Sequence, residues 1–243
     1  MSNELTAPTL GAHLEIGALL YDGLDQIDLT GPFEVLSRIS NSTYRIYGLT
    51  EDPVRDIQGL RLTPDSSIED APPLDVLQVP GGSGQEQLMH DERLLNWLRV
   101  QTANAQCVLS VCTGALLLGA AGLLRGRRAT THWSALEVLS LFGADPVDER
   151  VVIDGHIVFA AGVTSGIDAA LTVAARLRDV QTAQEIQLQM VYAPEPPFNS
   201  GTPQTAPPEI LAAAQSATAK ITRQRVDTAR EINAYMSKQD PAL

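Results

Sequence analysis

Cysteine is scarce in this chain. Only two cysteines, Cys107 and Cys112, occur among its 243 residues. They are five positions apart, and an odd spacing directs two side chains to opposite faces of an extended segment, so we expect no disulfide between them. Two free thiols are in keeping with a reducing compartment.

Positive charge and long apolar runs are also limited. The chain has 17 Lys and Arg residues against 29 Asp and Glu residues, a formal net charge of -12. Binding to a polyanion relies on clustered Lys and Arg, so nucleic acid is not an expected partner. No apolar stretch approaches the roughly 20 residues that cross a bilayer, and no basic and apolar leader precedes "MSNELTAPTLGAH". We therefore expect a cytoplasmic protein without membrane contact.

The chain alternates short apolar runs with segments of helical composition. Strand-like runs occupy residues 14–21, 44–50, 60–65, 74–79, 106–111 and 128–133, and a hairpin is expected around residues 154–155. Helical patterns occupy residues 28–39, 91–105, 114–124, 134–143 and 164–177. Strands separated by helices predict an α/β fold with a mostly parallel sheet, helices on both faces, and ligands at the carboxyl ends of the strands.

Three segments are expected along the chain. Residues 1–13 form an N-terminal tail, residues 14–208 an α/β domain, and residues 209–243 a C-terminal helical extension. The stretch before the extension, residues 193–208, is rich in Pro and Gly and is not expected to form regular structure. The helix itself, about 30 residues, is long for a compact domain; packing on the domain, extension to a second subunit and fraying are all open for it.

Cys112 lies where the buried run ending "VLSV" meets "CTGALLLG". A strand that turns sharply into a helix is the elbow geometry that holds a nucleophile in a strained position. The helix N-terminus at such a turn would lower the pKa of the thiol. A small buried hydrophobe is the alternative for Cys112, and it is the interpretation preferred for Cys107.

Several separated motifs, in order, resemble the ThiJ/PfpI superfamily. They are "VPGGSG", "SVCTGALLLGAAGLLRGRRATTHW" and "AGVTSGIDAAL". With "IDLTGPFEVL" and "YAPEPPFNSGTP" the chain resembles the isonitrile hydratase branch, from about residue 14 to residue 203. The resemblance implies a flavodoxin-like fold with a cysteine at a nucleophile elbow.

Carried over residue by residue, the resemblance makes Cys112 the nucleophile and Asp28 its acidic partner. Without the resemblance, Asp28 would be interpreted as a helix N-cap. The backbone N–H groups of Gly82 and Thr113 become oxyanion donors, Gly81 permits the close turn, and Val163 lines the site.

His132 is a further candidate, because a cysteine and a histidine suggest a dyad. The peptidase-like branch places His directly after the nucleophile, where this chain has Thr113, and no His-x-Glu pair of a glutamine amidotransferase follows. A hydrogen-bonded structural role is the alternative for His132. The sequence has no Cys/His cluster and no phosphate-binding glycine motif, so neither a metal nor another cofactor is expected.

The branch implies hydration of an isonitrile to an N-substituted formamide, through a Cys112 thioimidate with Asp28 as acid and base. Two other classes stay open: a ligand-sensing domain such as AraC-type transcription regulators carry, and a glyoxalase- or deglycase-like stress protein. The acidic balance and the single helical tail argue against a helix-turn-helix module in this chain. The resemblance also implies a homodimer.

Overall fold

The computed structural model describes residues 11–239, so most of the predicted tail at residues 1–13 lies outside the described residues. The strands are β1 (Leu14–Leu20), β2 (Ser42–Gly48), β3 (Val54–Arg55), β4 (Arg61–Leu62), β5 (Ser66–Ser67), β6 (Val76–Val79), β7 (Cys107–Val111), β8 (Arg128–Ala129), β9 (Asp145–Pro146), β10 (Val151–Asp154) and β11 (Ile157–Ala160). The helices are α1 (Gln26–Leu36), α2 (Gln85–Leu88), α3 (Glu92–Asn104), α4 (Gly114–Ala120), α5 (Ser165–Leu177), α6 (Val180–Gln189) and α7 (Pro208–Gln239), with 3-10 helices η1 (Ile68–Asp70) and η2 (Trp133–Phe142).

A seven-stranded sheet in the order β10-β11-β7-β6-β1-β2-β5 forms the centre. Every neighbouring pair is parallel except β10 and β11, which form the hairpin predicted around residues 154–155. The mostly parallel sheet predicted from the apolar pattern is thus confirmed. Because β1, β6 and β7 are adjacent and parallel, their carboxyl ends meet at one edge of the sheet.

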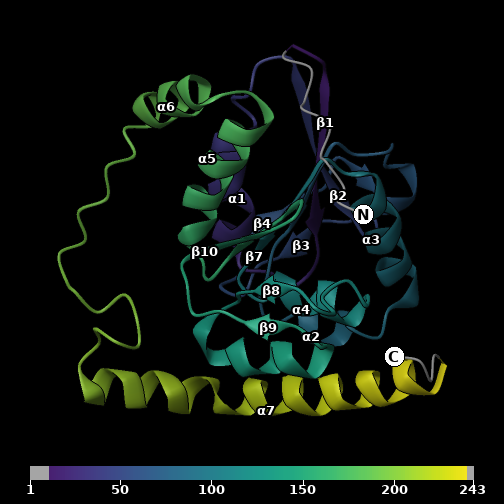
Figure 1. The fold of residues 1–243 in the computed structure, drawn as a ribbon, viewed down its shortest axis with the longest axis vertical. Coiled ribbons are helices and arrows are strands. Elements are labelled where there is room, and N and C mark those ends of the chain that lie inside the picture. Colours follow the sequence, from purple (N-terminus) through teal and green to yellow (C-terminus); the bar gives the residue numbers. More distant parts are fainter. Residues whose placement is uncertain (1–10, 240–243) are drawn as a thin grey trace.

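Helices cover both faces of the sheet, with α1 and α5 on one side and α3 on the other (Figure 1). Strand β11 shows how the faces alternate: Ile157 and Phe159 belong to one buried apolar cluster, and Val158 and Ala160 to the other. The first cluster also includes side chains of α3, α4, η2 and α7, and the second those of α1, α5 and α6. Each face of the sheet therefore has its own core.

Some elements differ from the predictions. The run at residues 128–133 contributes only Arg128–Ala129 to a strand, which pairs with β9 outside the main sheet. The segment after it is a 3-10 helix, η2, which begins after its N-cap His132 and ends at Phe142, before its C-cap Gly143. Cys107 and Cys112 are both free, as expected, but they lie in the same apolar cluster. The predicted alternation fails because the chain turns at Cys112 and is no longer extended.

The C-terminal helix α7 is continuous over 32 residues and packs along η2 at the edge of the domain (Figure 1). Before it, the chain between α6 and α7 runs as an irregular, extended segment on the outside of the molecule, as its Pro and Gly content predicts (Figure 1). Of the three fates open to the helix, packing on the domain is what the structure shows. No helix in the described part of the chain combines the length and the apolar character that crossing a membrane requires.

Small residues bring α4 close to the sheet, as the sequence predicts. A Cβ atom added to Gly114 would collide with the carbonyl oxygen of Val79 at the end of β6, and one added to Gly119 would collide with the ring of Phe142. Backbone atoms cannot yield as a flexible side chain can, so Gly114 sets how closely the elbow helix approaches β6.

We expect Gly114→Ala to lower the free energy of unfolding by about 1–3 kcal/mol, because the added methyl group must displace the β6 backbone. Urea denaturation followed by circular dichroism measures this. The control is Gly201→Ala, where an added Cβ meets nothing within 4 Å. Equal stability of the two variants would contradict the close approach.

Candidate active site

Cys112 lies in the sharp turn between β7 and α4, with a backbone φ of 54°. A non-glycine residue rarely adopts this left-handed conformation, so its surroundings must hold it there. The Cys112 N–H donates to the Ala160 carbonyl (3.0 Å), and the Cys112 carbonyl accepts from Thr131 Oγ1 (2.6 Å). The elbow predicted from the sequence is present, and its cysteine is only 7% exposed.

Asp28 lies in the first turn of α1 and is fully buried. The interpretation of Asp28 as a helix N-cap is wrong, because Asp25 caps α1 by accepting from the Ile27 N–H (3.3 Å). Asp28 instead points into the protein. Its Oδ2 accepts from the Gly81 N–H (3.0 Å), and its Oδ1 has no hydrogen-bond partner among the described residues.

The carboxyl of Asp28 and the thiol of Cys112 interact, and both are removed from water. Burial, and next the charge of Asp25, raise the pKa of Asp28 to about 8, against the opposing effects of the Gly81 N–H and of Cys112. Burial also raises the pKa of the Cys112 thiol well above its ordinary value, and the negative charge of Asp28 adds to this. The prediction of a lowered thiol pKa is therefore not met, because burial outweighs the short helix α4.

Two groups act in the opposite direction and lower the pKa of the Cys112 thiol. They are a hydrogen bond from the Thr113 N–H and, with a smaller effect, the positive charge of Arg225. Because the two acidic groups are coupled, protons leave the pair in steps that belong to both residues. A pair that holds one proton can exist as thiolate with carboxylic acid or as thiol with carboxylate.

The glycine turn after β6 connects these groups. A Cβ atom on Gly81 would collide with the backbone nitrogen of Thr113 and crowd Asp28 Oδ2, so only glycine fits between the nucleophile turn and the carboxyl. The Gly82 N–H donates to Thr113 Oγ1 (3.1 Å). Of the two expected backbone donors, Thr113 thus directs its N–H to the sulfur, whereas the Gly82 N–H is used by the Thr113 hydroxyl.

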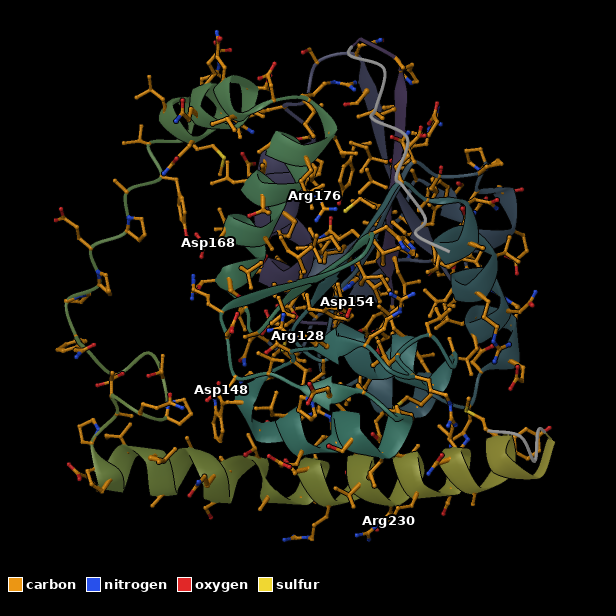
Figure 2. All side chains as sticks on the ribbon, in the orientation of Figure 1. Arg128, Asp148, Asp154, Asp168, Arg176 and Arg230 are labelled. Atoms are coloured by element: carbon orange, nitrogen blue, oxygen red, sulfur yellow. The ribbon has the colours of Figure 1, made fainter. Side chains whose placement is uncertain are left out.

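A cavity of about 580 Å³ is lined in part by Thr131, whose hydroxyl donates to the Cys112 carbonyl; Cys112 and Asp28 themselves are not among its lining residues. Its walls include the expected pocket residue Val163, the candidate His132, and residues 201–204 of the segment that precedes α7. Gln204 Nε2 donates to Asp148 Oδ2 (2.7 Å), so the segment is tied to the body of the domain at this wall; Figure 2 labels Asp148 on the side of the domain that faces the segment. The volume is within the range of ordinary small-molecule pockets.

His132 lies at the N-terminus of η2. Its Nδ1 accepts from the Ser134 N–H (3.3 Å) and lies 2.8 Å from Ser134 Oγ. Burial, and next the charge of Arg225, lower the pKa of His132 to about 4, so its imidazole is neutral at pH 7. These contacts are of the kind expected for a structural histidine, and no described contact joins His132 to the thiol.

Sequence reasoning missed Arg225, Tyr21 and Gln85, which are buried around the glycine turn. Tyr21 donates its hydroxyl to the Pro80 carbonyl (2.9 Å), and Arg225 Nε donates to Gln85 Oε1 (2.8 Å). A signal for Arg225 existed: its spacing from Ala229 and Ile232 places all three on one face of the helix, and all three are buried. Within residues 11–239, no three His, Cys, Asp or Glu side chains gather as a metal site would require.

Comparison with known proteins places these features in context. Residues 15–176 match the model of the DJ-1/PfpI family. An isonitrile hydratase of Pseudomonas putida is 48% identical over 214 residues, which cover 88% of this chain and 94% of that protein. An HTH-type transcriptional regulator of Pseudomonas aeruginosa is 32% identical over 164 residues, 66% of this chain but only 48% of the regulator.

Among solved structures, a ThiJ/PfpI family protein from Pseudomonas syringae superposes with a TM-score of 0.88 at 37% identity, covering 94% of this chain and 96% of that one. The superposition extends over nearly the whole chain and bears out the fold. The segment that matches the family model contains the elbow, the glycine turn and Asp28. The protein is a member of the DJ-1/PfpI family.

Proposed function

We propose that this protein is an isonitrile hydratase, which adds water to an isonitrile and releases the N-substituted formamide. The observation that carries the proposal is the buried pair of Cys112, strained in its elbow, and Asp28, whose pKa is raised to about 8. The similarity to the Pseudomonas putida isonitrile hydratase over 88% of this chain supports it.

The first step needs a nucleophile and an acid together. The Cys112 thiolate attacks the terminal carbon of R–N≡C while the Asp28 carboxyl gives its proton to the same carbon, which yields the thioimidate R–N=CH–S–Cys112. An ordinary carboxyl would already be ionised at neutral pH. Burial keeps the proton on Asp28 up to about pH 8, so this carboxyl can donate it.

Water completes the reaction. Asp28, now a carboxylate, takes a proton from a water molecule whose oxygen bonds to the thioimidate carbon, and that proton passes to the nitrogen. The carbon–sulfur bond of R–NH–CH(OH)–S–Cys112 then breaks. The hydroxyl proton returns to the Cys112–Asp28 pair, and R–NH–CHO leaves. The Thr113 N–H, which is directed at the sulfur, stabilises the thiolate both before attack and when it departs.

The cavity near the elbow has room for a substrate of modest size, and its lining residues include the charged Asp148, Glu149 and Arg150. Val163 and Trp133 contribute apolar groups to its walls, and Thr131, another lining residue, is hydrogen-bonded to the Cys112 carbonyl. We place the R group of the isonitrile in this cavity, with the reactive carbon toward the thiol.

A second candidate is a ligand-sensing domain without catalysis, favoured by the match to about half of the Pseudomonas aeruginosa regulator. A sensing domain would bind an isonitrile or a related molecule and release it unchanged, whereas the hydratase returns formamide. The homodimer and the cytoplasmic location implied by the resemblance stay predictions, as does the division of the chain at residue 208.

We expect Cys112→Ala to lower formamide formation by at least about 1,000-fold, since no other described thiol reaches the site. Formamide released from an alkyl or aryl isonitrile is measured by chromatography. The matched control is Cys107→Ala, which removes the other buried thiol at the far end of β7 and should keep most of the activity. Wild-type turnover by the Cys112 variant would show that the nucleophile is wrongly assigned.

We expect Asp28→Asn to abolish proton transfer and also to stabilise the protein at neutral pH. The folded pKa of Asp28, about 8, lies above the unfolded value of 3.8, so the folded state binds a proton that the unfolded chain has lost. The protonated Asp28 makes its full contribution to the free energy of unfolding of the wild type below pH 4. This contribution is lost as the pH rises toward 8. The neutral amide has no such loss.

The stability advantage of Asp28→Asn should therefore grow by roughly 4 kcal/mol from pH 4 to pH 7, measured by urea denaturation across this range. Asp52→Asn, at an exposed position, is the control and should show no comparable trend. A constant difference between Asp28→Asn and wild type at all pH values would mean that Asp28 is ionised in the folded protein.

A further inference from the structure

The C-terminal helix α7 reaches the active site through one buried face. Arg225, Ala229 and Ile232 lie along this face and are at most 7% exposed. Thr222 Oγ1 donates to the Ser134 carbonyl of η2 (3.2 Å), and Thr228 donates to Glu86 of α2. The helix is thus fixed on both sides of Arg225.

Arg225 carries a guanidinium into the interior next to the glycine turn. It is 5% exposed, its Nε donates to Gln85 Oε1 (2.8 Å), and its Nη2 donates to the Gly82 carbonyl (3.4 Å). Gly82 in turn exchanges hydrogen bonds with Thr113 Oγ1, in the residue after Cys112. The glycine turn thus connects the guanidinium to the elbow through hydrogen bonds.

A buried guanidinium needs a negative partner, because removing a charge from water without compensation costs several kcal/mol. None of the ion pairs among residues 11–239 includes Arg225. The groups coupled to its charge are Cys112, Glu86 and Tyr21, together with His132.

These four groups differ in whether they can be negative. Burial raises the pKa of Tyr21 well above its ordinary value, so its hydroxyl is neutral, and His132 carries no negative charge. Glu86 is partly buried: its Oε1 accepts from Thr228, and its Oε2 is buried without a hydrogen-bond partner among the described residues, so this carboxyl is one group that can be negative near Arg225. Asp28 holds its proton up to about pH 8. Burial raises the pKa of the Cys112 thiol too, and the charge of Arg225 opposes this rise, so the guanidinium stabilises the ionised form of Cys112.

We propose that Arg225 is a positioning residue of the active site, whose buried guanidinium supplies the positive charge that stabilises the Cys112 thiolate, so that helix α7 is part of the catalytic machinery. This rests on the proposed role of Cys112 as nucleophile. Arg225 lies beyond residues 15–176, the part that matches the family model, so this element is an addition to the family core.

When the pair holds one proton, that proton lies either on Asp28, beside a Cys112 thiolate, or on the Cys112 thiol, beside an Asp28 carboxylate. The guanidinium favours the first of these two forms. Lys at this position would keep the charge and lose the forked hydrogen bonds to Gln85 and Gly82. Gln would keep a polar group of similar length and lose the charge. These two substitutions separate charge from packing.

The test follows alkylation of Cys112 by iodoacetamide as a function of pH, read from the mass of the peptide that contains Cys112. In folded Arg225→Gln we expect the midpoint to rise by at least about one pH unit and the rate at pH 7 to fall about tenfold or more. Arg225→Lys should return most of the rate. Arg230→Gln, on the face of α7 that points away from the domain, should behave as wild type (Figure 2).

A second measurement uses the unaltered protein, so that the outcome does not depend on how Arg225→Gln folds. In protein labelled with ¹⁵N-arginine, the Nε–H resonance of Arg225 should shift with the same midpoint as Cys112 alkylation, and should stop titrating there once Cys112 is alkylated. The proposal would be overturned by an alkylation midpoint in folded Arg225→Gln equal to that of the wild type. It would also be overturned by an Arg225 Nε–H resonance that does not shift as Cys112 ionises. Neither readout uses an isonitrile, so failure of the proposed hydration is detected separately.

Discussion

The site depends on two acidic side chains, Cys112 and Asp28, that are buried against each other. Neither can ionise freely, because each charged form is short of water and repels the other. Other groups of the site stabilise the charged forms of these two side chains. Gly81 brings a backbone N–H to the carboxyl, Thr113 brings one to the sulfur, and Arg225 brings a positive charge from the C-terminal helix. Together they decide where a shared proton lies.

The same constraint connects stability with function. Keeping a carboxyl protonated at neutral pH costs folding free energy, since the unfolded chain would release that proton. Holding Cys112 at a φ of 54° and burying an arginine outside any carboxylate ion pair of the described residues add further costs. Strain and unfavourable burial gathered at one edge of the sheet are typical of a site selected for chemistry, and the two apolar cores on either face of the sheet offset them.

The sequence predicted the parts of this protein that depend on local pattern. Apolar runs located the parallel strands, and small residues after Cys112 indicated a close helix and a sharp turn. Local pattern indicated Asp28 as the helix cap, whereas α1 begins two residues before Asp28 and is capped by Asp25. Only the resemblance directed Asp28 to the thiol. Its interaction with Cys112 depends on β1, β6 and β7 lying side by side, which is a tertiary property.

One expectation failed, and one residue was missed, because of desolvation. The thiol pKa was predicted to fall because a helix begins next to it, but α4 has seven residues and burial has the larger effect. The helical spacing could place Arg225 on the buried face of α7, but not beside the glycine turn, because that contact joins segments more than a hundred residues apart in the chain. In both cases the energetics come from desolvation, which a linear pattern of residues does not express.

The most direct test of this account is the titration of Asp28 itself. In protein labelled with ¹³C-aspartate, the Asp28 Cγ resonance, assigned by its absence in Asp28→Asn, reports protonation at each pH. We predict a main midpoint near pH 8, in the range where Cys112 is coupled to it. A midpoint near 4, as in an ordinary exposed carboxyl, would contradict the account, because Asp28 would then have no proton to give to an isonitrile carbon at neutral pH.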